Sequence, residues 1–145
     1  VCAMRARMIT IFFMLYFGII VSSFAGEAYD LNGDWDVIIT KTGAESSTEV
    51  LNEKDIIKIS QQGNQFVGIR TNGGKLVGKN EEMIKGKLSH KMVDEVYIRF
   101  VNDPITFGRG WADGRATIIE NGNKIVIQSF IKDTGYYETV TLTRK

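Results

Sequence analysis

The residues best suited to catalysis or metal binding are few in this sequence and are not grouped. His90 is the only histidine, and the only cysteine, Cys2, lies near the N-terminus. Zinc sites need several cysteine, histidine or carboxylate ligands, and a Ser-His-Asp arrangement would also have to use His90. Asp34 and Asp36 flank Trp35, and we expect both to be solvated charges. The sequence therefore predicts no catalytic residue, metal site or cofactor, and favours a protein that is not an enzyme.

The segment 102–111 has the composition of a binding loop. It contains the only proline, one glycine on each side of Arg109, and the aromatic residues Phe107 and Trp111. Large aromatic side chains on a wet loop are costly unless they cover something. We expect one of these rings to cover a ligand or bind a partner, or else to plug the fold permanently. Arg109 is the candidate cation for a carboxylate-headed ligand.

The rest of the chain predicts short strands. Runs of β-branched residues are separated by turn signals about every 8 to 15 residues, a spacing typical of an all-β sandwich or barrel. Gly63-Asn64 and Asn121-Gly122 have the composition of two-residue hairpin turns. The predicted strands are residues 34–40, 55–61, 65–71, 83–89, 93–101, 112–120, 124–131 and 136–144.

The predicted connections alternate in length. Long loops at 41–54, 72–82 and 102–111 are separated by tight turns. Alternate connections of an up-and-down antiparallel sheet lie at opposite ends, so we expect the long loops at one end, which we call the open end, and the tight turns at the closed end. This layout is typical of an eight-stranded antiparallel barrel that holds a ligand. An open sandwich is the alternative.

Closure of the barrel would bring the first strand beside the last, with Arg144 over Trp35. A cation over an indole ring contributes about 0.5–2 kcal/mol. With Gly33-x-Trp35 at the start of the first strand and Arg144 near the end of the last, the sequence resembles the calycin superfamily, and the lipocalins most of all in layout. The resemblance implies a lipocalin-like barrel with a ligand-binding role. The sequence lacks the Thr-Asp-Tyr-like middle motif of lipocalins, so the resemblance identifies no particular ligand.

The alternation of apolar and polar side chains along the strands predicts an apolar interior and a polar, solvent-exposed outer face. A membrane barrel has the reverse arrangement. Phe100 and Tyr136 have inward positions near the open end, where they would line the entrance. Small inward residues such as Gly86 and Gly114 either leave room for a ligand or let bulky neighbours interlock. Arg70 is expected on the outer face. The inward set is Trp35, Val37, Ile39, Ile57, Ile59, Val67, Ile69, Ile84, Leu88, Val96, Ile98, Phe100, Ala112, Ala116, Ile118, Ile125, Ile127, Ile131, Val140 and Leu142.

Residues 1–25 have the pattern of a secretory signal peptide. Two arginines precede the apolar stretch 8–21, and small residues lead to a cleavage site between Ala25 and Gly26. Residues 26–145 would then be the lipocalin-like barrel domain of a secreted or periplasmic protein, with no stable membrane insertion after cleavage. An uncleaved anchor is the alternative, but the stretch is shorter than the roughly 20 residues of a spanning helix.

The charge balance narrows the choice of partners. From Gly26 onward there are 11 Lys and 5 Arg against 17 Asp and Glu, which gives no field to attract nucleic acid. The leading hypothesis is a non-enzymatic protein that binds a small apolar or amphipathic ligand through its open end. The alternative is a filled barrel that acts as a protein-interaction or inhibitor module through the same loops. The candidate ligand-binding residues are Phe100, Phe107, Arg109, Trp111 and Tyr136.

Overall fold

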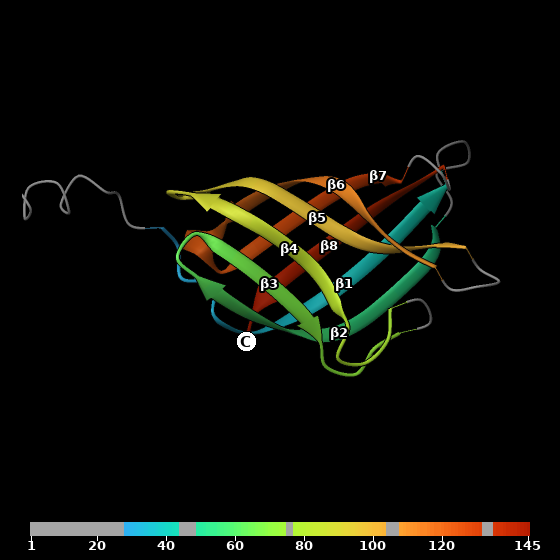
Figure 1. Cartoon of the computed structure of the whole chain (residues 1–145), viewed down its shortest axis with the longest axis horizontal. Coiled ribbons are helices and arrows are strands. Elements are labelled where there is room, and N and C mark those ends of the chain that lie inside the picture. Colours follow the sequence, from blue (N-terminus) through green and yellow to red (C-terminus); the bar gives the residue numbers. More distant parts are fainter. Residues whose placement is uncertain (1–27, 44–48, 75–76, 104–107, 132–134) are drawn as a thin grey trace, which may run out of the picture.

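Eight antiparallel strands follow one another around a closed barrel in the computed structural model of the protein (Figure 1). This confirms the predicted all-β, up-and-down antiparallel architecture. The structure describes residues 28–43, 49–74, 77–103, 108–131 and 135–145. The strands are β1 (Gly33–Gly43), β2 (Glu49–Gln62), β3 (Gln65–Arg70), β4 (Glu82–Ser89), β5 (Met92–Asp103), β6 (Gly108–Ile119), β7 (Lys124–Ile131) and β8 (Tyr136–Arg144), and the short 3-10 turn η1 (Glu120–Gly122) joins β6 to β7.

The predicted signal peptide, residues 1–25, lies outside the described residues. Among the described residues, no helix has the length and apolar character needed to cross a membrane.

Two of the three loops predicted to be long are shortened, because their flanking strands run further than expected. β1 continues to Gly43 and β2 begins at Glu49, while β5 continues to Asp103 and β6 begins at Gly108. Each added residue pair satisfies backbone groups that would otherwise need water. Only the connection 71–81, between β3 and β4, is long as predicted.

The closed end is organised around Trp35. The Arg144 guanidinium lies over its ring, with Cζ 4.4 Å from the ring centroid, which confirms the predicted contact. The indole N–H donates to the Leu31 carbonyl at 2.9 Å, and Arg144 Nη2 donates to the Asp30 carbonyl at 2.7 Å. These bonds hold residues 28–32, which we call the N-terminal strap, across the closed end of the barrel.

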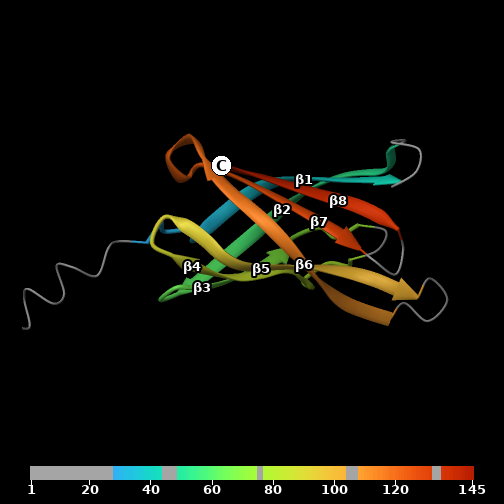
Figure 2. The ribbon, with the colours of Figure 1, turned by 90° about the horizontal axis from the view of Figure 1, so that it is seen from above.

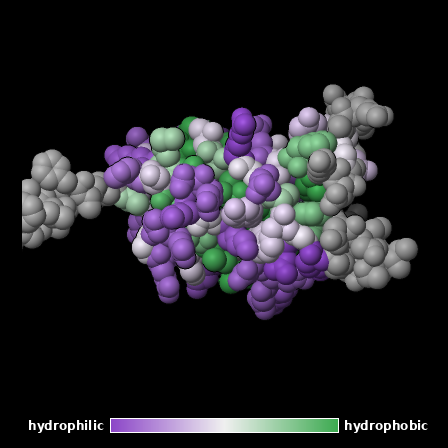
Figure 3. All heavy atoms as spheres, turned by 45° about the horizontal axis from the view of Figure 1, so that its top comes forward, coloured by the Kyte–Doolittle hydropathy of each residue, from purple (hydrophilic) through white to green (hydrophobic). Residues whose placement is uncertain are grey.

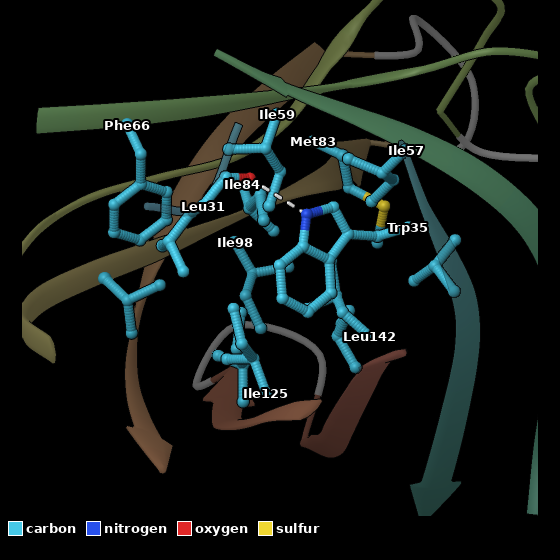
Figure 4. Packing of buried hydrophobic residues seen from close by; sticks show 14 of the residues in the cluster. Leu31, Trp35, Ile57, Ile59, Phe66, Met83, Ile84, Ile98, Ile125 and Leu142 are labelled. Carbon is cyan, nitrogen blue, oxygen red and sulfur yellow. Dashed lines mark hydrogen bonds between the residues drawn. The ribbon is translucent and has the colours of Figure 1, made fainter. Parts of the chain in front are cut away.

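The closed-end part of the interior is filled by the protein's own apolar side chains. Trp35 packs among isoleucines from several strands (Figure 4). A Cβ atom on Gly86 would lie 2.6 Å from the Phe66 ring, so this glycine lets a bulky neighbour interlock and leaves no room for a ligand. The buried cluster comprises Leu31, Trp35, Val37, Ile39, Ile57, Ile59, Phe66, Val77, Met83, Ile84, Leu88, Val96, Ile98, Ile125, Ile127, Val140 and Leu142.

The prediction for the faces of β3 was wrong. Phe66 and Arg70 are buried, whereas Val67 is half-buried and Ile69 is 37% exposed. Apolar residues occupy both faces of this strand, so alternation alone does not decide which face turns inward. The buried ion pairs of Arg70, described below, allow its charged side chain to take an inward position.

β6 changes neighbours midway along its length. Residues 108–113 pair with β5, and residues 114–119 pair with β7. The β5–β6 hairpin therefore diverges from β7 and β8 toward the open end (Figures 1 and 2). At this branch point the Ser129 hydroxyl donates to the Asp113 carbonyl at 2.6 Å, so a side chain satisfies a backbone acceptor where strand pairing ends.

The outer surface of the strands is mainly hydrophilic. Asp34 and Asp36 are exposed, as predicted. In the face shown in Figure 3, hydrophilic side chains predominate and apolar surface shows between them. The exposed large apolar side chains among the described residues are Ile38, Ile69, Met92, Ile119, Phe130 and Tyr137.

Candidate functional site

Charged side chains lie inside the barrel between its apolar core and the open end. We call Lys41, Glu53, Asp55, Arg70 and Glu138 the polar layer. They come from β1, β2, β3 and β8, where each continues the inward alternation of the apolar residues on its own strand. Asp55, Arg70 and Glu138 are buried, and Lys41 and Glu53 are nearly so.

Arg70 holds one side of the polar layer. Its Nε donates to Asp55 Oδ2 at 2.8 Å, and its Nη1 donates to Glu53 Oε2 at 3.1 Å. Asp55 also accepts three backbone N–H bonds, two of them from Asn72 and Gly73 in the connection 71–81. Burial raises the pKa of Asp55, but the bonds from Arg70 and the backbone outweigh it and hold that pKa below its usual value. Asp55 is therefore ionised inside the barrel.

Glu138 holds the other side. Its Oε2 lies 3.7 Å from Lys41 Nζ, an ion pair longer than a hydrogen bond. Burial raises the pKa of Glu138, and the nearby charges of Lys41 and Arg70 only partly offset this.

Two atoms of the polar layer lack a hydrogen bond, although one of them, Glu138 Oε2, has the 3.7 Å ion pair with Lys41. Within the described part of the chain, Glu138 Oε2 and Arg70 Nη2 are buried without a hydrogen-bond partner. Most buried polar atoms in proteins are paired with protein atoms, water or a ligand. A molecule bound beside these two atoms would complete their hydrogen bonding.

Two of the sequence-predicted site residues lie next to the same buried side chain, that of Ile131. Phe100 packs with Ala112 and Ile131 in a second, smaller apolar cluster. Tyr136 pairs with Ile131 across β7 and β8 and is half-buried. Phe100 and Tyr136 thus lie on the same side of the barrel entrance, as the strand alternation predicts.

Trp111 lies on the outer face of β6, with Lys85 Nζ 4.2 Å and Arg99 Cζ 5.3 Å from its ring centroid. Arg109 donates to both carboxylate oxygens of Glu81, at 3.0 and 3.1 Å. Glu81 belongs to the connection 71–81 at the open end. A role of either residue in covering the barrel mouth stays a prediction. The remaining predicted residue, Phe107, is outside the described residues.

Sequence reasoning missed the polar layer. Lys41 and Glu53 fall in a segment predicted to be a loop, and Arg70 was assigned to the outer face. The alternation along the second strand does indicate it. Every second residue before Ile59 and Ile57 has the same inward position, and these residues are Asp55 and Glu53. The inward series on the last strand, continued backward from Val140, passes through Glu138.

The fold defines the class of the protein as a closed, eight-stranded, up-and-down β-barrel. No family model matches the sequence, and no curated protein matches it. Among the described residues, no group of three or more histidine, cysteine, aspartate or glutamate side chains is arranged to hold a metal ion.

Proposed function

We propose that this is a secreted or periplasmic, non-enzymatic binding protein that takes a small amphipathic ligand through the open end of its barrel. The observation that carries the proposal is that two buried atoms of the polar layer, Arg70 Nη2 and Glu138 Oε2, lack a hydrogen bond. A buried polar group without a partner costs about 1–3 kcal/mol. A ligand head group that offers both an acceptor and a donor would recover this free energy.

The apolar part of the ligand would contact Phe100 and Tyr136. The deeper interior is filled by the main apolar cluster, which leaves the polar layer and the small Phe100 cluster as the inner surface nearest the entrance. This arrangement favours an amphipathic ligand over a wholly apolar one. Contributions of Phe107, Arg109 and Trp111 to ligand capture stay predictions.

Two sequence features support the rest of the proposal. The pattern of residues 1–25 favours export, and the resemblance of Gly33-x-Trp35 and Arg144 to the calycin superfamily favours a carrier of small molecules. The contact of Arg144 with Trp35 is compatible with that superfamily.

A matched pair of ligands tests the head-group requirement. Octanamide carries an acceptor and a donor on a short apolar chain, whereas methyl octanoate carries acceptors only. Isothermal titration calorimetry should detect octanamide binding and much weaker binding of the ester. Glu138→Leu removes the acceptor and should weaken octanamide binding by about tenfold, because one hydrogen bond is worth roughly 0.5–1.5 kcal/mol.

Thr143→Ala, at an exposed position on the same strand, is the control and should leave octanamide binding unchanged. Equal binding of the two ligands, or an equal loss in both variants, would contradict a head group held by Glu138.

A second candidate function is a protein-interaction or inhibitor module. The filled closed-end core and the interlocked Gly86 favour it, because a barrel without a hollow interior acts through its surface. Native mass spectrometry of the protein isolated from its own host separates the two candidates. A bound mass of a few hundred daltons, typical of small-molecule ligands, would favour the carrier, and a bound polypeptide would favour the module.

A further inference from the structure

The surface of β6, β7 and β8 carries a groove beside the branch point, and Glu138 of the polar layer is among the residues that line it. Its volume is about 590 Å³, within the range of about 300–1,000 Å³ found for small-molecule sites. Two of its lining residues, Ser129 and Glu138, are buried. The outward-pointing side chains that line it are those of Asp113, Arg115, Gln128, Phe130, Tyr137 and Thr139.

Two exposed aromatic rings form one side of the groove. Phe130 on β7 pairs with Tyr137 on β8, and their ring centroids lie 4.9 Å apart with the planes inclined at 43°. Phe130 is 48% and Tyr137 54% exposed. Neighbouring apolar rings that stay in water are a frequent mark of a binding surface. Their inclined planes offer a ligand two flat apolar faces.

The other outward aromatic side chains of this wall are less accessible. Lys85 and Arg99 both lie over the Trp111 ring, and Lys85 also lies 5.8 Å from the Tyr97 ring centroid. Those rings already have cationic partners within the chain. Among the described residues that line the groove, Phe130 and Tyr137 have only each other as aromatic partners.

The polar side of the groove carries balanced charge. Asp113 and Arg115 have opposite charges, and Gln128 and Thr139 supply neutral donors and acceptors. The exposed charges of the groove therefore cancel, and the other ionisable residue that lines it, Glu138, is buried beside Lys41. The groove offers hydrogen-bonding groups of both kinds opposite two aromatic faces.

We propose that this groove binds a neutral oligosaccharide. A sugar ring presents a face of C–H groups that packs on aromatic rings, and a rim of hydroxyls that donate and accept hydrogen bonds. The C–H faces would lie on Phe130 and Tyr137. The hydroxyls would bond to Asp113, Arg115 and Gln128.

Affinity gel electrophoresis with soluble neutral polysaccharides tests this proposal on the full chain. The probes are starch, xyloglucan, galactomannan and a mixed-linkage β-glucan. At least one should retard the protein, and the retardation should persist in about 1 M NaCl, where charge interactions are screened within roughly 3 Å. The double variant Phe130→Ser/Tyr137→Ser should bind about tenfold more weakly, as expected when two stacking contacts are lost.

Met92→Ser is the matched control, since it removes an exposed apolar side chain at the far end of the barrel and should leave the retardation unchanged. Far-UV circular dichroism checks that each variant is folded. Three outcomes would overturn the proposal: no retardation by any of the four polysaccharides, retardation abolished by salt, or a dimer in analytical ultracentrifugation that Tyr137→Ser dissociates. The last would show that a second copy of the chain covers the groove.

Discussion

At the scale of single residues, two carboxyl groups in the same interior have pKa values shifted in opposite directions. Both are buried, and burial raises the pKa of each. For Asp55, four hydrogen bonds to the charged form outweigh burial and lower the pKa. For Glu138, the 3.7 Å ion pair with Lys41 does not compensate, and the pKa is raised. The number of hydrogen bonds to the carboxylate, rather than depth, therefore decides the direction in which each pKa shifts.

This difference predicts that Glu138→Gln stabilises the protein at neutral pH. A carboxyl with a raised folded-state pKa makes the folded protein bind more protons than the unfolded one between the two pKa values, so stability falls as pH rises through that window. Glutamine removes this loss, and the gain is about 1.4 kcal/mol for each unit by which the pKa is raised. Urea unfolding at a series of pH values should show the gain shrinking below about pH 4, near the pKa of glutamate in the unfolded chain.

Two further substitutions complete this test, one as a neutral control and one with the opposite expected effect. Glu95→Gln, at an exposed position on β5, should change the unfolding free energy by less than about 0.5 kcal/mol. Asp55→Asn should act with the opposite sign, because a lowered pKa stabilises the fold above the unfolded-state pKa and this is lost as pH falls through the folded-state value. A Glu138→Gln variant less stable than the parent at pH 7 would show that its ion pair with Lys41 outweighs burial.

At the scale of secondary-structure elements, the strands and their order are predictable because they depend on local signals. β-Branched runs and turns such as Gly63-Asn64 are read directly from the chain. The ends of β1, β2, β5 and β6 are less predictable, because strand pairing extends into segments with weak local preference. Which side chains of β3 point into the barrel depends on the ion pair of Arg70 with Asp55, a residue 15 positions away in sequence.

The candidate site is predictable only in part for the same reason. Phe100 and Tyr136 follow from alternation along their own strands. The polar layer exists because charged residues from four strands meet at one level of a closed barrel, and a single strand does not contain that information. Trp111 lies on the wall because Lys85 and Arg99 from neighbouring strands stack on it.

The N-terminal strap gives the second prediction, at the level of one element. Arg144 donates to the carbonyls of Asp30 and Asn32 while its planar group covers Trp35. Arg144→Lys keeps the charge but loses the forked geometry, so the variant should lose about 1–2 kcal/mol of unfolding free energy, the value of one or two hydrogen bonds.

Chemical denaturation measures this loss, and limited proteolysis should show faster cleavage within residues 28–32. Arg115→Lys, an exposed arginine on β6, is the control and should change neither measurement. Unaltered proteolysis in Arg144→Lys would mean that Leu31, rather than Arg144, holds the strap.

At the scale of the whole molecule, charge divides the interior of the barrel into two apolar regions. The main cluster surrounds Trp35 at the closed end, and the small cluster of Phe100, Ala112 and Ile131 lies beyond the polar layer. At the level of the small cluster, residues 108–113 of β6 pair with β5 and not with β7. Residues 108–113 of β6 therefore have a strand partner on one side, whereas β1 and β8 are paired on both sides.

This division predicts two levels of stability within one barrel. Amides of β1 and β8, such as those of Val37 and Val140, should exchange hydrogen only when the whole protein unfolds, whereas amides of residues 109–112 should exchange through local opening. Phe100→Ala should accelerate exchange in that hairpin by at least tenfold and leave the slowest amides of β1 nearly unchanged. Ile127→Ala in the main cluster should instead lower the global unfolding free energy by about 2–5 kcal/mol. Native-state hydrogen exchange measured by NMR distinguishes these results. If Phe100→Ala accelerated the exchange of all amides equally, the polar layer would join the two regions into one cooperative unit.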